Sequence, residues 1–315
     1  MIHSYKLNKK EFAKKKILIT GGTGSIGSEI VRQLLKCGPM QIRIYSRDES
    51  KHFFLQKELD DLNTKKINIK YLIGDIRDRE RLSRALRDVD IVFHAAALKH
   101  VPYCEYNPFE AIKTNVYGTQ NVIDLAIEHN VAKVIAISTD KAVYPNGIMG
   151  ITKLLMERMI TSSYHYIGPS KTKFAVVRFG NVLNSRGSVI PTWIDQIEKG
   201  KSVTVTDKEM TRFFISIPKA VELVFLASTM MKGQEIFVLK MKEENIYELA
   251  QKTIEKYGKG KKISIKLIGS REREKLTEKL FTQEEEATMI KMDKYYVIYP
   301  NKELYSERVK QNKGK

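Results

Sequence analysis

The sequence feature that most constrains the fold is a spaced run of glycines between an aliphatic stretch and an amphipathic one. Residues 17–19 predict a buried strand, and apolar residues recur at helical spacing from Ile30 to Leu35. A phosphate group can reach the backbone amides at a helix N-terminus only where no Cβ blocks its approach. This strand–turn–helix setting therefore predicts a nucleotide-binding turn made by Gly21, Gly24, Ser25, Ile26 and Gly27.

Apolar runs of strand length then return at regular intervals. They cover residues 42–45, 69–73, 90–94, 134–137 and 174–177, with helical patterns between them. Alternating strands and helices predict an α/β fold, a doubly wound parallel Rossmann sheet. After a polar lead-in at 1–13, we expect residues 14–180 to form this dinucleotide-binding domain. Residues 181–315 are expected to form a smaller mixed α/β substrate-binding lobe, of which about 213–240 returns to the first domain.

Composition and charge narrow the classes of partner. The chain carries 55 lysines and arginines against 37 acidic residues, a formal net charge of +18. It has no zinc-ligand spacing and no interleaving of basic and aromatic residues, so we expect no metal site and no nucleic-acid partner. A basic surface of this kind suits anionic small molecules. Only two cysteines, and no apolar run of membrane-spanning length, lead us to expect a cytoplasmic protein without a membrane span.

The end of the second strand predicts the choice of cofactor. Ser46, Arg47 and Lys51 follow this strand. An acidic side chain here holds the ribose 2′-hydroxyl of NAD, whereas an arginine suits the 2′-phosphate of NADP. We therefore expect NADP, although Asp48 directly follows Arg47 and keeps NAD open as the alternative.

The ends of the next strands add further expected cofactor residues. Asp75 is expected either to hold the adenine amino group or to cap the helix that begins near Asp78. Small residues after the fourth strand let a cofactor lie close to the backbone. The remaining expected cofactor-binding residues are Ile76, Ala95, Ala96, Lys99 and Asn115, the last on a long helix expected at about 109–129.

Polar and ionisable residues directly follow the strand at 134–137. Thr139, Asp140 and Lys141 stand there, and Met149 and Lys153 lie four residues apart, on one face of the next helix. Open α/β sheets carry their chemistry outside the carboxyl ends of the strands. These five residues are therefore the candidate catalytic group, while a plain turn followed by a surface helix is the alternative.

Eight motifs together carry a resemblance to a known family. Six of them resemble the extended short-chain dehydrogenase/reductases: residues 20–27, 45–49, 95–102, 105–108, 138–142 and 178–182. Two more narrow the resemblance to the inverting UDP-N-acetylglucosamine 4,6-dehydratases, namely 185–191 and 210–213. The resemblance extends from about Lys16 to about Glu285.

The resemblance implies an enzyme that makes 4-keto-6-deoxy sugar nucleotides for surface glycans. NADP removes a hydride from C4 of the hexose, a base removes the C5 proton, an acid expels the C6 hydroxyl, and the hydride returns to C6. Asp140 is then the acid, Lys141 the base and Thr139 a hydrogen-bonding partner of the sugar, while Lys153 binds the nicotinamide ribose. An ordinary lysine is charged at neutral pH, so Lys141 needs desolvation or a cationic neighbour such as Lys153.

The resemblance also implies the substrate site and the assembly. His100, Asn181, Arg212, Arg271 and Glu274 are expected to bind the UDP-sugar, with the two arginines on its diphosphate. The family forms oligomers through helices beside the catalytic one, so we expect a homo-oligomer, a dimer or a hexamer. The helix after Pro108, with Ile112, Val116, Val122 and Leu125, is the candidate face.

Two departures from the family pattern leave questions open. Met149 stands where the superfamily carries the tyrosine that accepts the C4 hydroxyl proton, and a thioether cannot accept it. Lys141, a water held by Thr139, and Tyr144 are the alternatives for that role. Residues 271–275 also lack the proline and glycine of the family's turn. A UDP-sugar 4-epimerase and a non-catalytic NADP-binding protein therefore remain alternatives to the dehydratase.

Overall fold

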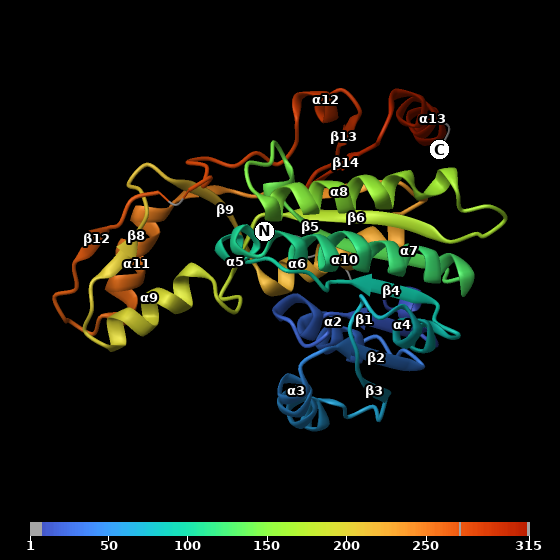
Figure 1. The fold of residues 1–315 in the computed structure, drawn as a ribbon, viewed down its shortest axis with the longest axis horizontal. Coiled ribbons are helices and arrows are strands. Elements are labelled where there is room, and N and C mark those ends of the chain that lie inside the picture. Colours follow the sequence, from blue (N-terminus) through green and yellow to red (C-terminus); the bar gives the residue numbers. More distant parts are fainter. Residues whose placement is uncertain (1–7, 271, 314–315) are drawn as a thin grey trace.

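A large twisted sheet with helices on both faces forms the centre of the molecule (Figure 1). The structure is a computed structural model and describes residues 8–270 and 272–313. Within them, the sheet has nine strands in the order β13-β14-β10-β6-β5-β4-β1-β2-β3, and the pairings from β10 to β3 are parallel. The strands are β1 (Lys16–Thr20), β2 (Gln41–Ser46), β3 (Asn68–Ile73), β4 (Ile91–His94), β5 (Lys133–Thr139), β6 (Lys173–Phe179), β10 (Ile236–Leu239), β13 (Met289–Lys291) and β14 (Tyr295–Ile298). The predicted doubly wound Rossmann sheet is confirmed.

Each face of the sheet is covered by its own layer of helices, because successive strand residues point to opposite faces. In β1, Ile17 and Ile19 join one apolar cluster and Leu18 joins the other. The first layer is α2 (Ser25–Leu35), α3 (Glu49–Leu62) and α10 (Ile217–Met230). The second layer is α4 (Arg79–Leu86), α7 (Gly118–Glu128) and α8 (Ile148–Ser162).

The expected polar lead-in is partly wrong. Residues Lys9–Phe12 form the short helix α1, and the Phe12 side chain is fully buried. Its ring centroid lies 4.7 Å from that of Phe225 and 6.2 Å from that of Phe93. A single apolar residue among lysines gives no periodic signal, so the sequence pattern could not reveal this anchor.

The long helix expected at 109–129 is interrupted. It consists of α6 (Pro108–Ile112), a π-helical turn (Lys113–Tyr117) and α7, and it follows the short helix α5 (Val101–Tyr106). Such turns inside helices often occur at functional sites. Here the turn carries Asn115, which is buried against the loop after β4.

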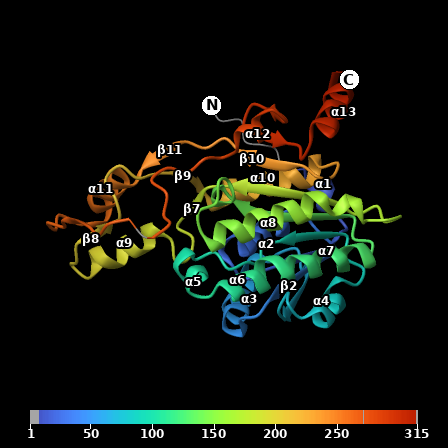
Figure 2. The same ribbon diagram turned by 45° about the horizontal axis from the view of Figure 1, so that its top comes forward.

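A smaller lobe projects from one end of the sheet (Figure 2). It packs α9 (Val189–Glu198) and α11 (Ile246–Tyr257) around the buried Trp193, beside β8 (Val203–Val205) and β12 (Ile265–Leu267). A three-stranded sheet adjoins it, formed by β7 (Asn181–Leu183), β9 (Thr211–Ser216) and β11 (Glu243–Asn245).

Residues 181–315 contribute more strands to the Rossmann sheet than we expected, since the sequence predicted a return to the first domain only at about 213–240. Residues of β10 pair in parallel with β6, and the β13–β14 hairpin then adds an antiparallel edge beyond β10. This edge also carries α12 (Gln283–Glu286) and α13 (Lys302–Lys313). A boundary predicted from the change in the strand–helix alternation missed the hairpin because its two strands are short and only residues 292–294 separate them. Among the described residues, no helix combines the length and apolar character that a membrane crossing requires.

Candidate active site

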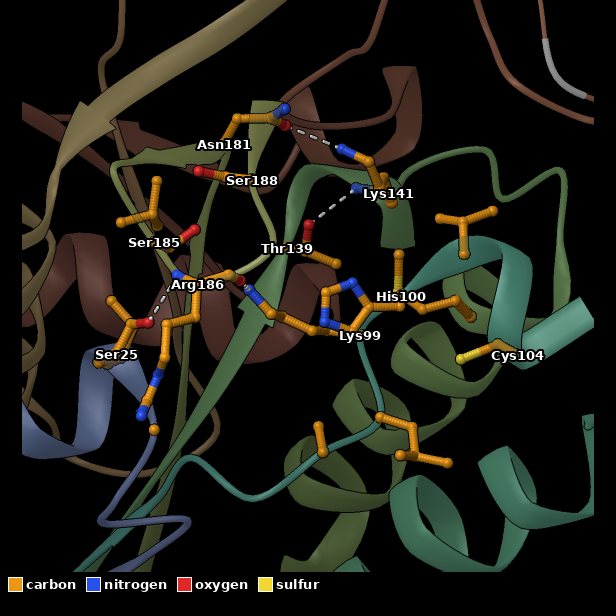
Figure 3. Close-up of a pocket in the computed structure, with 18 of the residues that line it drawn as sticks. Ser25, Lys99, His100, Cys104, Thr139, Lys141, Asn181, Ser185, Arg186 and Ser188 are labelled. Atoms are coloured by element: carbon orange, nitrogen blue, oxygen red, sulfur yellow. Dashed lines mark hydrogen bonds between the residues drawn. The ribbon is translucent and has the colours of Figure 1, made fainter. Parts of the chain in front are cut away.

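A pocket of about 780 Å³ runs along the carboxyl ends of the parallel strands and under the smaller lobe. Figure 3 shows Lys141 and Asn181 together at the top of this pocket and Ser25 and Arg186 at its lower left. The glycine-rich turn, the ends of β2, β4 and β5, and the start of α8 all contribute to its wall. The fold therefore brings most of the sequence-predicted residues into one continuous cavity.

The glycine-rich turn is a cradle that side chains would fill. Gly21 has φ +65°, and a Cβ on it would lie 2.7 Å from the Ala96 backbone nitrogen. A Cβ on Gly27 would lie 2.4 Å from the carbonyl oxygen of Gly21. Gly24 is the N-cap of α2, so the free amides of this helix open toward the pocket. This geometry fits the diphosphate of a dinucleotide.

Asp48, the acidic residue after β2 that would favour NAD, already has hydrogen-bonding partners within the protein. The Asp48 carboxylate accepts a hydrogen bond from the Lys51 backbone nitrogen at 2.9 Å, as the N-cap of α3, and pairs with the Lys51 ammonium at 2.5 Å. The Arg47 side chain is 52% exposed and lines the pocket, 3.4 Å from the Asp75 carboxylate. These contacts favour Arg47 over Asp48 as the group that meets the ribose.

Asp75 does not cap the next helix, so that alternative is wrong. Its carboxylate accepts the Arg77 backbone N–H at 2.9 Å and pairs with the Arg77 and Arg47 guanidinium groups. Burial alone would raise the pKa of Asp75, but hydrogen bonds and charge from Arg77 hold it below its usual value. The N-cap of α4 is instead Asp78, three residues later in the chain.

Asn115 supports the pocket without lining it. Its side-chain oxygen accepts the Leu98 N–H at 2.8 Å, and its side-chain nitrogen donates to the Leu98 carbonyl at 3.0 Å and to the Thr152 hydroxyl at 3.1 Å. The residue therefore fixes the loop after β4 to α8. The same loop carries Lys99 and His100 into the pocket, where burial lowers the pKa of both.

The predicted catalytic residues after β5 form a tight charged cluster. Asp140 is fully buried, and one of its carboxylate oxygens accepts hydrogen bonds from the Thr139 hydroxyl at 2.9 Å and from the Lys141 ammonium at 3.1 Å. The other oxygen has no hydrogen-bond partner among the described residues. The Lys141 ammonium also donates to the Asn181 side-chain oxygen at 3.0 Å.

Helix α8 presents Met149 and Lys153 to the same cavity, and both are buried. The helix can approach the catalytic turn because Gly150 has no side chain: a Cβ there would lie 2.4 Å from the Lys141 carbonyl oxygen. The Lys153 ammonium donates to the Ile137 carbonyl at 2.6 Å. Burial lowers its pKa to about 8, with Glu157 acting in the opposite direction.

Tyr144 does not line the pocket, which argues against it as the predicted alternative for the C4 proton acceptor. The residue has φ +46°, is half exposed, and does not line the pocket. Its hydroxyl accepts a hydrogen bond from the Gln283 backbone nitrogen at 3.0 Å.

The predicted substrate-binding residues of the smaller lobe reach the pocket from the other side. Arg212 is buried and donates to the carbonyls of Thr211 and Leu276 at 2.7 and 2.9 Å, while Glu274 lies 3.4 Å from its guanidinium. Arg212 and Glu274 both line the cavity. Arg271 lies outside the described residues.

The pocket also contains residues that were not predicted, among them Arg186 and Glu278. The Arg186 backbone nitrogen donates to the Ser25 hydroxyl at 3.1 Å, its guanidinium donates to the Thr23 carbonyl, and its carbonyl accepts from Lys99 at 3.0 Å. This residue belongs to the motif at 185–191, a signal that could have placed it in the site. Glu278 is buried 3.7 Å from the Lys141 ammonium, and no motif pointed to it.

The comparisons with known proteins define the class. Residues 17–300 match the family described as polysaccharide biosynthesis protein, and the chain belongs to this family. The inverting UDP-N-acetylglucosamine 4,6-dehydratase of Campylobacter jejuni is 44% identical over 92% of this chain and 84% of its own length. The resemblance stated from the motifs, to the extended short-chain dehydrogenase/reductases and these dehydratases, is thereby confirmed.

Other relatives carry different names. A protein of Methanocaldococcus jannaschii named an uncharacterized membrane protein is 53% identical over 92% of this chain and 87% of its own. A Rickettsia akari protein named UDP-glucose 4-epimerase is 44% identical over 91% of this chain and 83% of its own. The X-ray structure of Pen from Bacillus thuringiensis superposes with a TM-score of 0.88, at 44% identity over 91% of this chain and 89% of that one. The chain thus belongs among nucleotide-sugar dehydratases and epimerases.

Proposed function

We propose that the chain is a C5-inverting UDP-N-acetylglucosamine 4,6-dehydratase that works with NADP. The observation that carries the proposal is the ion pair of Asp140 and Lys141: Lys141 lines the same pocket as the glycine-rich turn and Lys153, and Asp140 is buried beside it. The Campylobacter jejuni relative with this name supports the substrate and the C5 inversion.

The residues around the cradle suit a nicotinamide dinucleotide. Gly21, Gly24 and Gly27 leave room for its diphosphate, Ser46 and Arg47 stand where the adenosine ribose would end, and Lys153 stands at the nicotinamide end. When bound, this group supplies the acceptance and return of a hydride. Lys153 would bind its ribose as a charged or neutral donor, since the pKa of about 8 puts both forms near neutral pH.

The residues of the cluster divide the proton transfers. Oxidation at C4 acidifies the C5 proton, which Lys141 removes after passing one proton of its ammonium to the hydrogen-bonded Asp140 carboxylate. Asp140 then gives this proton to the departing C6 hydroxyl, while Thr139 orients the Asp140 carboxyl group through their hydrogen bond. His100, Asn181 and Arg212 would hold the UDP-sugar across the pocket.

The decisive experiment incubates the purified protein with UDP-N-acetylglucosamine and NADP and identifies the product by NMR. A 4-keto-6-deoxy product with inverted C5 is expected. Recovery of unchanged substrate would refute the proposal. Recovery of the C4 epimer alone would support the second candidate, a UDP-sugar 4-epimerase, which the name of the Rickettsia akari relative favours.

Arg47 is expected to set the preference for NADP. Replacing Arg47 with alanine should weaken NADP binding about 10- to 100-fold, because a charge-assisted hydrogen bond contributes about 1.5–3 kcal/mol. NAD binding should change less than about threefold, since Asp48 is engaged by Lys51 in either variant. Calorimetric titration of both variants with both cofactors measures this. Tighter binding of NAD by the wild type would contradict the assignment.

A homo-oligomer is expected, but its face differs from the one read from the sequence. Val122 and Leu125 are buried in the core, so that part of the expected face is wrong. Exposed apolar side chains nearby include Phe109 on α6, Tyr117 in the π-helical turn, and Ile151 and Leu155 on α8.

Light scattering at micromolar concentration should therefore give a mass at least twice 36.3 kDa for the wild type. The double substitution of Ile151 and Leu155 by glutamate should give the monomer, because burying two charges in an interface without partners is unfavourable. The same double substitution at Lys252 and Lys256, which are exposed and four residues apart on α11, is the control. A monomeric wild type would contradict the expectation.

A further inference from the structure

The loop between β7 and α9, residues 184–188, leads into the smaller lobe and contacts the glycine-rich turn of the Rossmann sheet. Its residue Arg186 donates its backbone N–H to the Ser25 hydroxyl at 3.1 Å, and its carbonyl accepts from the Lys99 ammonium at 3.0 Å. Figure 3 shows Arg186 between these two side chains, which belong to opposite walls of the pocket. This residue therefore spans the cleft in which a dinucleotide would lie.

The guanidinium of Arg186 lies close to the end of β2. It donates to the Thr23 carbonyl, and the hydroxyl of the buried Thr23 side chain hydrogen-bonds to the Ser46 hydroxyl at 2.8 Å. Ser46 directly precedes Arg47, and all four residues line the pocket. The end of the second strand is where a dinucleotide-binding fold recognises the 2′-position of the ribose. Hydroxyl and guanidinium groups from the glycine-rich turn, β2 and the loop at 184–188 therefore gather at this end of the pocket.

An excess of positive charge remains at this end of the pocket. Asp48 pairs with Lys51 at 2.5 Å and Asp75 with Arg47 at 3.4 Å, whereas Arg186 forms no ion pair within residues 8–270 and 272–313. Hydrogen bonds from Lys51 hold the pKa of Asp48 below its usual value, and the charge of Arg186 acts in the same direction. A guanidinium without an acidic partner suits a phosphate monoester, which carries nearly two negative charges.

We propose that Arg186 is a specificity-determining residue that binds the 2′-phosphate of NADP together with Arg47, an inference that rests on the proposed NADP-dependent function. The guanidinium has five N–H donors, so it can keep the Thr23 carbonyl and still donate to a phosphate. Because Arg186 belongs to the loop at 184–188, the phosphate also fastens this loop across the dinucleotide. NAD has no such phosphate and leaves the loop with its contacts to the protein alone.

The first test separates recognition of the phosphate from anchoring of the loop. Arg186→Gln removes the charge but keeps an N–H donor for the Thr23 carbonyl, and it leaves the backbone contacts with Ser25 and Lys99 in place. Calorimetric titration of this variant should show NADP binding weakened about 10-fold or more, because a charge-assisted hydrogen bond is lost. NAD binding should change less than about threefold, since NAD places no charged group at this position.

Titration with 2′,5′-ADP and with 5′-AMP isolates the 2′-phosphate, because neither compound contains the diphosphate. Arg186→Gln should weaken the binding of 2′,5′-ADP and leave that of 5′-AMP unchanged. Lys199→Gln is the matched control: it removes a positive charge from the same lobe, where the ammonium pairs with Asp195 on the exposed surface. This control should bind every compound as the wild type does. Equal weakening of NADP and NAD in Arg186→Gln would assign Arg186 to the diphosphate and overturn the proposal.

The second test measures the loop directly, through the deuterium uptake of peptides that cover residues 184–188. At saturating cofactor, NADP should slow this uptake about fivefold or more relative to NAD in the wild type. In Arg186→Gln the two cofactors should give the same uptake, because the charge that meets the phosphate is gone. Equal uptake with NADP and NAD in the wild type overturns the claim that the phosphate fastens the loop.

The outcomes distinguish this inference from the proposed function. A wild type that binds NAD more tightly than NADP refutes the NADP dependence and, with it, the role of Arg186. A wild type that prefers NADP, with an unchanged preference in Arg186→Gln, overturns the role of Arg186 alone. A wild type that binds NADP but forms no 4-keto-6-deoxy product refutes the dehydratase, while the titrations still judge Arg186.

Discussion

Replacing Lys141 with alanine is expected to stop dehydration and to abolish the incorporation of solvent deuterium at C5 of the sugar. Loss of a positioned base lowers the rate by about 100- to 10,000-fold. Lys141 is the amine of the cluster, and its ammonium is held by Asp140, Asn181 and Glu278. Removing it also leaves the buried Asp140 carboxylate without its cation, whereas Glu278 keeps Lys275. We therefore expect the loss to fall near the upper end of this range.

The measurement is NMR of the product formed in deuterated water, for the wild type and for Lys141→Ala. Binding of NADP and UDP should survive in the variant, because Lys141 forms no hydrogen bond or ion pair with the glycine-rich turn or Arg212 in the part of the chain that the structure describes. Lys199→Ala, at an exposed lysine paired with Asp195, is the control and should behave as the wild type. Near-normal exchange at C5 in Lys141→Ala would contradict the assignment and direct attention to Asp140 or Glu278.

The sequence revealed the parts of the fold that repeat a strong local pattern. The strands of the parallel sheet are apolar on both faces, and the run at 134–137 lies within β5, whose interior is buried. The glycine-rich turn was equally clear, since Gly21 and Gly27 are positions where a Cβ meets backbone atoms. Local patterns of this strength fix both the layer architecture and the nucleotide cradle.

Contacts between distant segments explain what the sequence could not reveal. Glu278 reaches Lys141 across 137 residues of chain, and Arg186 reaches Thr23 across 163. Neither contact leaves a periodic signal, although Arg186 itself lies in the motif at 185–191. Asn115 is an example in the opposite direction. Its residue type suggested a contact with the cofactor, but its side-chain amide forms hydrogen bonds with Leu98 and Thr152 instead. Chemistry read from residue type locates a site, but the direction of each side chain depends on tertiary packing.

The second prediction with a large expected effect concerns the stability of the fold and the role of Arg178 in β6. This arginine is fully buried and forms bidentate pairs with Glu157 of α8 and Glu285 of α12, at 2.6 to 3.0 Å. It also donates to the Leu280 carbonyl at 2.9 Å. One guanidinium thus joins the catalytic helix, the sheet and the C-terminal segment that carries Glu278.

Replacing Arg178 with methionine should lower the free energy of unfolding by about 3–5 kcal/mol, because two buried carboxylates lose their partner. At this chain length the melting temperature should fall by about 5–15 °C. Arg84→Met is the control: its guanidinium pairs with Glu80 on an exposed helix surface, where such pairs contribute about 0–1 kcal/mol. Thermal and urea unfolding of the three proteins measure the difference.

The free energy of unfolding that Arg178→Met loses relative to the wild type should also depend on pH. This dependence distinguishes the loss of ion pairing from the loss of packing. Burial alone would raise the pKa of Glu285, but the hydrogen bonds and charge of Arg178 hold it below the usual value. A lowered folded-state pKa contributes stability that is present above the unfolded pKa of about 4.3 and is lost as the pH falls through the folded value. Without Arg178 this contribution disappears, and burial raises the pKa of the unpaired Glu285 above its usual value. The gap between variant and wild type should therefore narrow as the pH is lowered from 7 through that raised value and on below about 4. Adding Glu157→Gln and Glu285→Gln to the variant should recover part of the stability at pH 7, since neutral amides cost less to bury than unpaired carboxylates. A deficit that is the same at every pH and is not reduced by the two amides would show that packing of the arginine stem, and not its charge, holds α8 and α12 to the sheet.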